Sequence, residues 1–225
     1  MKDGQAKDIL TAEPIFDPMV STELKSGQTM LGANHYYYRD FVSDALSEGL
    51  QPMLPAVSLT TSDQLVYTGN AIFSKDEGLK LVGFLNTKES LYANWIADRQ
   101  TALEITSFIP QGDGNVSLQV ASLGRRIDVK MVNEQIHIDV HLTGKGVIVE
   151  NDSTLDPTQR KDLQIIQDEL SQTTQKSVQE LIEKVQKQYK TDIFGFGERV
   201  HEQYPYPWRT LKRDSNDTFS ELDVS

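Results

Sequence analysis

The sequence predicts an α+β protein in which an antiparallel sheet meander is covered by a long helix, with a smaller N-terminal α+β domain in front. Three observations carry this prediction. Apolar and polar residues alternate between about residues 103 and 142, as in strands with one buried face. A helical stripe of apolar residues then runs from Leu163 to Tyr189. The length of 225 residues exceeds one average domain, and we divide the chain into residues 1–98 and 99–225.

The smaller domain is expected to open with little regular structure. Two prolines break any helix around residues 15–20, which fit an extended stretch. A helix is predicted from about Asn34 to Glu48, because its apolar residues recur at helical spacing. Gly49 stands where a helix commonly stops.

Three strands and a second helix are expected to complete this domain. Strand-forming residues bounded by proline, glycine and turn residues predict strands over 56–60, 65–74 and 79–84. Asn86 or Thr87 is the predicted cap of the helix that follows. Its apolar stripe consists of Leu91, Trp95 and Ile96.

The second domain is predicted to begin with a four-stranded antiparallel meander. The loop Pro110–Asn115 separates the first two strands, Gly124 turns the chain into the third, and Asn133–Glu134 forms a tight hairpin turn. The fourth strand is expected to end near Gly144–Gly146. One face of this sheet is apolar, and the other carries Gln119, Asp128, Lys130, His137, Asp139 and His141.

A long helix is predicted to cover the apolar face. Asp156 is its candidate cap, Pro157 lies just inside its start, and the apolar stripe continues through Lys190. Such a helix would be ~50 Å long. Thr173 and Ser177 interrupt the stripe. The spacing also predicts two i,i+4 ion pairs, Glu180 with Lys184 and Glu183 with Lys187.

Composition and charge exclude several classes of protein. A net charge of −11 argues against a nucleic-acid binder and against electrostatic docking onto anionic lipid. With no cysteine, the chain has no disulfide, thiolate nucleophile or cysteine-bound metal. No apolar run reaches the ~20 residues that span a bilayer, and the first residues lack the apolar stretch of a signal peptide. We expect the chain as given to be soluble.

Few residue patterns point to chemistry. His137, Asp139 and His141 share one face of a strand, a spacing that could bring them to one metal ion, but a solvent-facing strand surface fits better. Gly112–Gly114 lacks the lysine of a phosphate-binding loop and reads as a hairpin loop. No Gly-x-Ser-x-Gly motif occurs, and 33 acidic residues make any chosen carboxylate pair uninformative. We therefore predict no catalytic residue, no metal and no cofactor.

The most specific stretch is Asp192-Ile-Phe-Gly-Phe-Gly-Glu198. Gly195 suits a backbone of positive φ, a short helix is expected to start at Gly197, and another helical turn at Trp208. Buried aromatic residues mostly serve packing, so we favour a compact corner packed on the sheet over a binding surface. If the corner does contact a partner, the candidate residues are Phe194, Phe196, Glu198 and Trp208.

This tail, with His201, Tyr204-Pro205 and Trp208, resembles the C-terminal region of the Ger(x)C family, the lipoprotein C subunits of spore germinant receptors. Gly69-Asn-Ala-Ile-Phe73 and Leu81-Val-Gly-Phe-Leu-Asn86, followed by Glu89, are similar to the middle of the same family, as is Pro52-Met-Leu-Pro55. The resemblance covers about residues 30 to 225.

The resemblance implies a non-enzymatic protein that acts in germination through contacts with other proteins. Family members begin with a secretory signal, a lipobox cysteine and a further domain, and continue past the strand that Leu222–Ser225 enters, so the chain is expected to be a fragment. A lipid tether would hold the protein on the outer face of the inner spore membrane. Its implied partners are the receptor's integral A and B subunits. The family supplies no catalytic or germinant-binding residue to carry over.

Two other functions remain open at this stage. One is a hydrolase of envelope polysaccharide that uses a carboxylate pair or a metal bound by His137, Asp139 and His141. The other is a sensor that binds a small molecule in a cleft between the domains. Bound metal would distinguish the first alternative, and ligand titration would distinguish the second.

Overall fold

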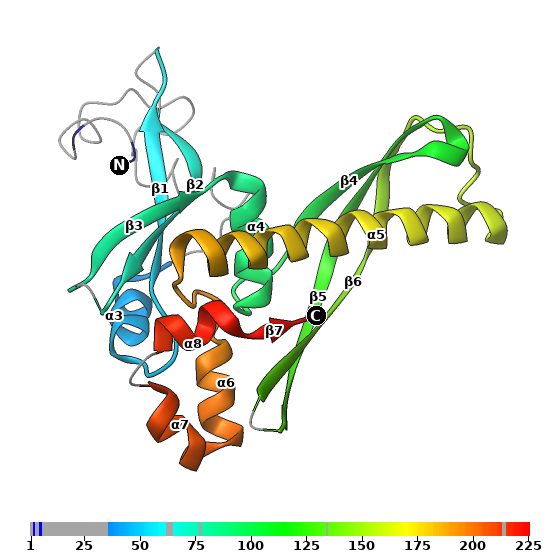
Figure 1. Ribbon diagram of the computed structural model, residues 1–225. Helices are drawn as coiled ribbons and strands as arrows, with labels where there is room; N and C mark the ends of the chain where they lie inside the picture. The colour runs from blue at the N-terminus through cyan, green and yellow to red at the C-terminus, as the bar shows by residue number, and fades with distance from the viewer. Residues whose placement is uncertain are drawn as a thin grey trace.

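The computed structural model describes Lys2, Gln5 and residues 36–61, 65–76, 78–133, 135–212 and 215–225. Its architecture is mixed α+β, as predicted: one small and one large sheet lie on either side of a central helix, and a long helix runs across the large sheet toward the small one (Figure 1). The extended stretch predicted over residues 15–20, and the start of the first helix at Asn34, lie outside the described residues.

The small sheet is antiparallel, with strand order β1-β2-β3. Its elements are α3 (Tyr38–Leu46), β1 (Met53–Leu59), β2 (Leu65–Ser74), β3 (Lys80–Leu85) and α4 (Thr87–Ile96). Helix α3 packs on this sheet, where the rings of Phe41 and Phe73 meet edge to face with their centroids 5.9 Å apart. The three predicted strands and both predicted helices of this part are therefore present.

Helix α4 begins with the predicted cap. The Asn86 side chain accepts a hydrogen bond from the backbone N–H of Glu89 at 2.8 Å, and Asn86 donates its own N–H to the Glu89 carboxylate at 2.9 Å. This reciprocal pair satisfies two backbone donors at the helix start. At the other end of α4, buried Trp95 reaches the large sheet, where its indole N–H donates to the carbonyl of Gly124 at 3.2 Å.

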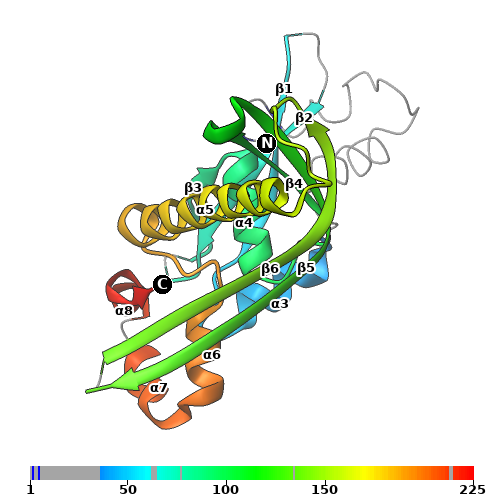
Figure 2. The same ribbon diagram turned by 90° about the vertical axis from the view of Figure 1, so that its right-hand side faces the viewer.

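The large sheet has the order β4-β5-β6-β7; three of these strands, β4 to β6, form the antiparallel meander, so the prediction of four meander strands is wrong. Its strands are β4 (Leu103–Ile109), β5 (Gly114–Val132), β6 (Gln135–Asn151) and the short β7 (Asp223–Val224), which pairs in parallel with β6. A single 3₁₀ turn, η1 (Pro110–Gly112), joins β4 to β5. Figure 2 shows β5 and β6 as one long, curved ribbon of two antiparallel strands.

The strand boundaries were predicted wrongly at three glycines of the ribbon. The chain does not turn at Gly124, which pairs with Thr143, and β6 does not end at Gly144–Gly146. A Cβ on Gly144 would lie 2.9 Å from the Val120 side chain, and one on Gly146 would lie 2.0 Å from a backbone carbonyl of β5. These glycines therefore mark close approach within a bent ribbon instead of turns.

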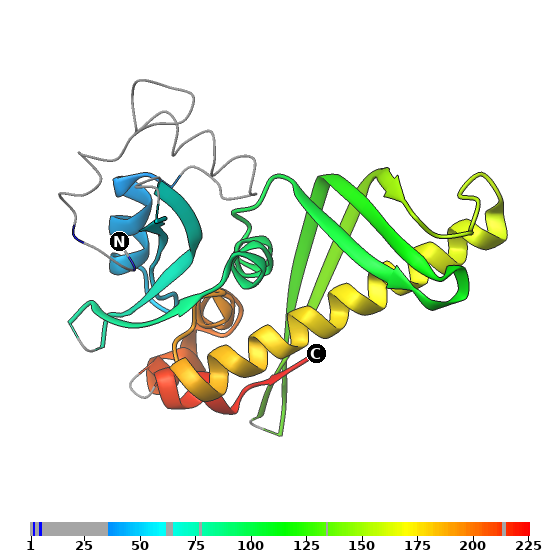
Figure 3. The same cartoon turned by 90° about the horizontal axis from the view of Figure 1, so that it is seen from above.

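Helix α5 (Arg160–Lys184) continues into a π-helical turn, η2 (Val185–Tyr189), and runs across the large sheet (Figure 3). It starts three residues later than Pro157, because Asp156 accepts the N–H of Thr158 at 2.9 Å in a turn before the helix. The predicted stripe faces the core, with Ile166, Leu170, Val178, Leu181 and Val185 buried.

The polar interruption of this stripe has a packing partner. The hydroxyl of Thr173 lies 2.6 Å from that of Ser107 on β4, so the two groups satisfy each other under the helix. Of the two predicted i,i+4 pairs, Lys187 pairs with Glu183 at 3.1 Å. Lys184 instead pairs with Glu89 of α4 at 2.7 Å, so the pair expected with Glu180 does not form.

The C-terminal segment returns to both sheets. Helix α6 (Phe196–Gln203), α7 (Pro205–Leu211) and α8 (Ser215–Glu221) gather at the C-terminal end of α5, and β7 then lies beside β6 (Figure 1). Buried residues of the two sheets and of these helices form one hydrophobic cluster. The division into residues 1–98 and 99–225 remains a prediction.

Candidate functional site

Asp192 organises the corner that follows η2. Its side chain accepts hydrogen bonds from the backbone N–H groups of Phe194 and Gly195, both at 3.0 Å, and of Gly197 at 2.7 Å. Gly195 adopts the expected positive φ, 80°, and stands at the N-cap of α6. One buried carboxylate thereby fixes the turn into α6, which explains why this short motif needs its aspartate and its glycines.

Burial raises the pKa of Asp192 to about 6, although the backbone N–H groups around it favour the ionised form. The carbonyl of the same residue accepts the N–H of Gln51 at 2.7 Å, which ties the corner to the chain leading into β1. The corner therefore holds the small sheet and the C-terminal helices together through one ionisable residue.

Phe194 and Phe196 lie in the hydrophobic core, with exposed fractions of 1% and 0%. Their ring centroids are 5.2 Å apart, and both lie within 6.4 Å of the Phe219 ring of α8. Side chains buried to this degree pack the C-terminal helices together and offer no surface of their own. Their assignment to a contact surface remains a prediction.

Trp208 and Glu198 lie close to the surface of the same corner. Trp208 is 4% exposed, stacks on His201 with centroids 5.7 Å apart, and directs its indole N–H toward the Glu48 carboxylate at 3.4 Å. Lys212 pairs with the same carboxylate at 3.1 Å and lowers the pKa of Glu48. Exposed Glu198 donates its backbone N–H to the carbonyl of Gly49 at 3.2 Å.

Gly49 lies where the two parts of the chain touch. Its φ is 90°, and a Cβ placed on it would lie 2.5 Å from backbone atoms at the start of α6. Gly197 faces it, and a Cβ there would lie 2.8 Å from the Trp208 ring. Both glycines therefore permit a backbone contact that larger residues would prevent.

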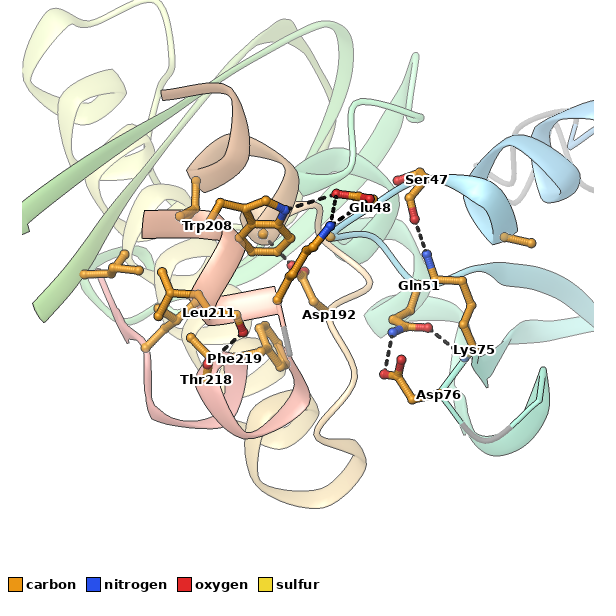
Figure 4. Close-up of a pocket in the computed structure, with 17 residues that line it drawn as sticks. Ser47, Glu48, Gln51, Lys75, Asp76, Asp192, Trp208, Leu211, Thr218 and Phe219 are labelled. Carbon is orange, nitrogen blue, oxygen red and sulfur yellow. Dashed lines mark hydrogen bonds and ion pairs between the residues drawn. The ribbon is translucent and has the colours of Figure 1, made fainter. Parts of the chain in front are cut away.

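A pocket of about 270 Å³ opens at this junction (Figure 4). One end is apolar and is formed by the C-terminal helices and β6, with Ile136, Val200, Trp208, Leu211 and Phe219 in its wall. The other end is polar and is formed by the chain before β1 and by the turn after β2, with Ser47, Gln51, Lys75 and Asp76. Asp192 and Glu48 lie between the two ends.

Hydrogen bonds fix the polar end. The Gln51 amide accepts the backbone N–H of Lys75 at 2.8 Å and donates to the Asp76 carboxylate at 3.1 Å. The Lys75 ammonium donates to the backbone carbonyls of Asp44 and Ser47. Burial lowers the pKa of Lys75, and in the described part of the chain no carboxylate forms an ion pair with it.

The three candidate metal ligands on β6 have different partners. His137 contacts Asp223 at 2.8 Å, His141 contacts Asp128 at 3.3 Å, and Asp139 pairs with Lys130 at 2.6 Å. Within the described residues no group of three or more histidine and acidic side chains is placed to hold a metal ion. The side chains belong to the exposed face of the ribbon.

Sequence reasoning missed most of the pocket. Trp208 was named and Asp192 lay within the singled-out motif, but Ser47, Gln51 and Lys75 carried no local signal. A partly buried ion pair nearby was also missed: Arg99, after α4, contacts Asp44 of α3 at 2.6 Å. These residues come from separate segments that only the fold brings together.

Known protein families and structures match most of the chain. Residues 68–225 match the family described as Spore germination B3/ GerAC like, C-terminal. Among curated proteins of Bacillus subtilis (strain 168), spore germination protein YndF is 24% identical over 159 residues, which are 71% of this chain and 39% of that protein. The putative spore germination protein YfkR is 22% identical over 98% of this chain and 58% of its own length.

Spore germination protein KC is 29% identical over 64% of this chain and 35% of its own length. The chain thus spans between about a third and three fifths of the length of these relatives. The crystal structure of the GerBC protein superposes with a TM-score of 0.74 over 99% of this chain and 64% of that one. At 19% identity this likeness concerns the fold. Among the described residues, no helix has the length and apolar character needed to cross a bilayer.

Proposed function

The chain belongs to the spore germination B3/GerAC-like family, the Ger(x)C family, and from this membership we propose that it acts as the C subunit of a spore nutrient germinant receptor. The observation that carries the proposal is the family match over residues 68–225. This range contains the large sheet, α5 and the Asp192 corner. The family likeness therefore covers the C-terminal side of the junction and the turn after β2, whereas Gly49 and Gln51 on its other side precede the matched range.

The proposed activity is assembly with other proteins and not catalysis. This proposal is supported by the ionisable groups that were candidates for a metal or catalytic site, because each of them contacts a partner of its own. His137, His141 and Asp139 each contact a different residue. The buried Asp192 carboxylate is directed at backbone N–H groups, in a structural arrangement. The polysaccharide hydrolase named as an alternative gains no support from these contacts.

The proposed partners are the integral A and B subunits of the receptor. We place the protein on the outer face of the inner spore membrane, held by an N-terminal lipid anchor on the full-length protein. A net charge of −11 would not hold the chain to anionic lipid, so acyl chains would supply the attachment.

The proposed contact surface is the exposed side of α6. Its Arg199 and Glu202 pair with each other at 2.7 Å, while buried Phe196 and Trp208 fix the helix from below. Glu198, at the first turn of α6, is the residue through which we expect the motif to reach a partner. Charged residues on a rigid helix favour orientation and selectivity of the contact more than its strength.

The experiment is a deletion of the gene in the natural spore former, with nutrient-triggered loss of optical density of purified spores as the readout. We expect deletion spores to lose the response to at least one nutrient and to keep germination triggered without nutrients. The full-length gene should restore the response. Unchanged responses to every nutrient that germinates the parent spores, with no other C subunit gene present, would contradict the proposal.

A further inference from the structure

The pocket at the junction has the size of a small ligand. Its volume is about 270 Å³, just below the ~300–1,000 Å³ of sites that take drug-sized molecules. It is amphipathic, because aromatic and aliphatic side chains form one end and amide, hydroxyl and charged groups form the other (Figure 4). A molecule with an apolar body and a polar head therefore matches its two ends.

Two hydrogen-bond donors at the polar end lack an acidic partner. The half-buried Lys75 ammonium donates two of its three N–H groups to backbone carbonyls. Among the described residues, no carboxylate forms an ion pair with it. The hydroxyl oxygen of Ser47 is buried and has no hydrogen-bond partner there. A partly buried charge and an unsatisfied hydroxyl are both costly, and a carboxylate would satisfy both.

The charge around the pocket requires more than a carboxylate. Three carboxylates, of Glu48, Asp76 and Asp192, line it against the two ammonium groups of Lys75 and Lys212. A simple anion would enter a surrounding of net negative charge. A ligand that carries an ammonium group beside its carboxylate meets both signs, with Asp76 as the exposed acceptor at the polar end.

The apolar end fixes the rest of the ligand. The Trp208 ring, together with Leu211 and Phe219, offers an aromatic and aliphatic wall for a short apolar side group. We propose that this pocket binds a free apolar α-amino acid, with its head group at Lys75 and Ser47 and its side group against Trp208. This inference goes beyond the proposed function and does not depend on it, because binding concerns the 225-residue chain alone.

The first test is a calorimetric titration of the chain at pH 7 with L-leucine, accompanied by tryptophan emission. We expect saturable binding, with a Kd below about 1 mM. Three analogues divide the ligand into its parts: leucinamide lacks the carboxylate, 4-methylpentanoate lacks the ammonium group, and glycine lacks the side group. Each should bind at least about 10-fold more weakly than leucine. If 4-methylpentanoate binds as tightly as leucine, the ligand does not need an ammonium group and the zwitterion requirement is wrong. If no saturable heat appears up to about 10 mM leucine, the pocket is not an amino-acid site.

The second test uses variants. K75M should weaken leucine binding about 10- to 100-fold, because it removes a charge-assisted hydrogen bond. S47A removes the unpartnered hydroxyl with little risk to folding and should weaken binding about 3- to 10-fold. The control K145M changes an exposed lysine of β6 and should bind leucine like the parent chain. Unchanged binding in a folded K75M and in S47A would overturn the assignment.

The emission signal has its own control. The chain has two tryptophans, and only Trp208 lines the pocket. W208F should therefore lose the leucine-induced change in emission. A change that persists in W208F would arise from Trp95 under the large sheet and would place the ligand elsewhere.

Discussion

The ionisation of Asp192 makes the stability of the junction depend on pH. Burial raises its pKa from 3.8 to about 6. The difference of ~2.2 units corresponds to ~3 kcal/mol at 1.36 kcal/mol per unit. Because the folded pKa lies above the unfolded one, the stabilising contribution is fully present below pH ~4 and is lost as the pH rises to about 6. We therefore expect this residue alone to lower the free energy of unfolding by ~2.4 kcal/mol between pH 4 and pH 7, because the unfolded carboxyl is already partly ionised at pH 4.

The variant Asp192→Asn isolates this contribution. Asparagine does not titrate, and it keeps an oxygen to accept the N–H groups of Phe194 and Gly195, while the bond from Gly197 is lost. Urea unfolding of both proteins from pH 4 to pH 8 gives the difference in unfolding free energy, in which the other acidic residues cancel to first order. The parent's advantage over the variant should shrink by ~2.4 kcal/mol across that range.

Carboxyl ¹³C NMR measures the same property at one residue. The side-chain signal of Asp192 should titrate with a midpoint near 6. A midpoint at or below 3.8, or a difference in unfolding free energy that does not change with pH, would show that the carboxylate is stabilised by its hydrogen bonds more than it is penalised by burial.

Two further predictions concern the same junction. Gly49→Ala should destabilise the chain by more than ~2 kcal/mol, because its φ is 90° and the added Cβ would lie 2.5 Å from the carbonyl carbon of Gly197. Gly78→Ala, with a φ of 77° but open space around the Cβ, should cost only ~1 kcal/mol by thermal or urea unfolding; equal losses would mean that the backbones do not touch. Phe196→Ala should cost ~3–5 kcal/mol because the ring is fully buried, whereas Tyr206→Ala, 79% exposed, should stay within ~0.5 kcal/mol. A Phe196 variant as stable as the Tyr206 control would contradict the core position of that ring.

Sequence patterns within one segment were sufficient to predict helices and strands that depend mainly on that segment. The second strand, residues 65–74, was predicted to the residue, and Asn86, the cap of α4, is one of the two caps predicted for that helix. The long helix and its buried stripe also follow from periodicity, since the partner surface does not change which residues face inward.

The glycines of the long ribbon show where such reasoning fails. Gly124 and Gly144 look like turns because turns and close contacts use the same residue. What distinguishes them is the Trp95 ring, which comes from α4 and lies 3.6 Å from a Cβ position on Gly144. No local window contains that neighbour, so two short strands were predicted where β5 is one long strand, and β6 was predicted to end too early.

The candidate site was predictable only in part, for the same reason. The motif at Asp192 was singled out, and packing was favoured over contact for its aromatic residues, which agrees with the burial of Phe194 and Phe196. The polar end of the pocket was not predicted, because Ser47 and Lys75 meet Trp208 only through the arrangement of three distant segments.

The central claim, that the chain is part of a receptor assembled from protein contacts, is tested most directly by co-purification. The full-length protein, tagged at its C-terminus, is isolated from detergent-solubilised inner membranes of spores, and its partners are identified by mass spectrometry. We expect the A and B subunits of one germinant receptor to be recovered in near-equal amounts with it. Recovery of the tagged protein without either subunit, from spores that still respond to nutrients, would contradict the claim.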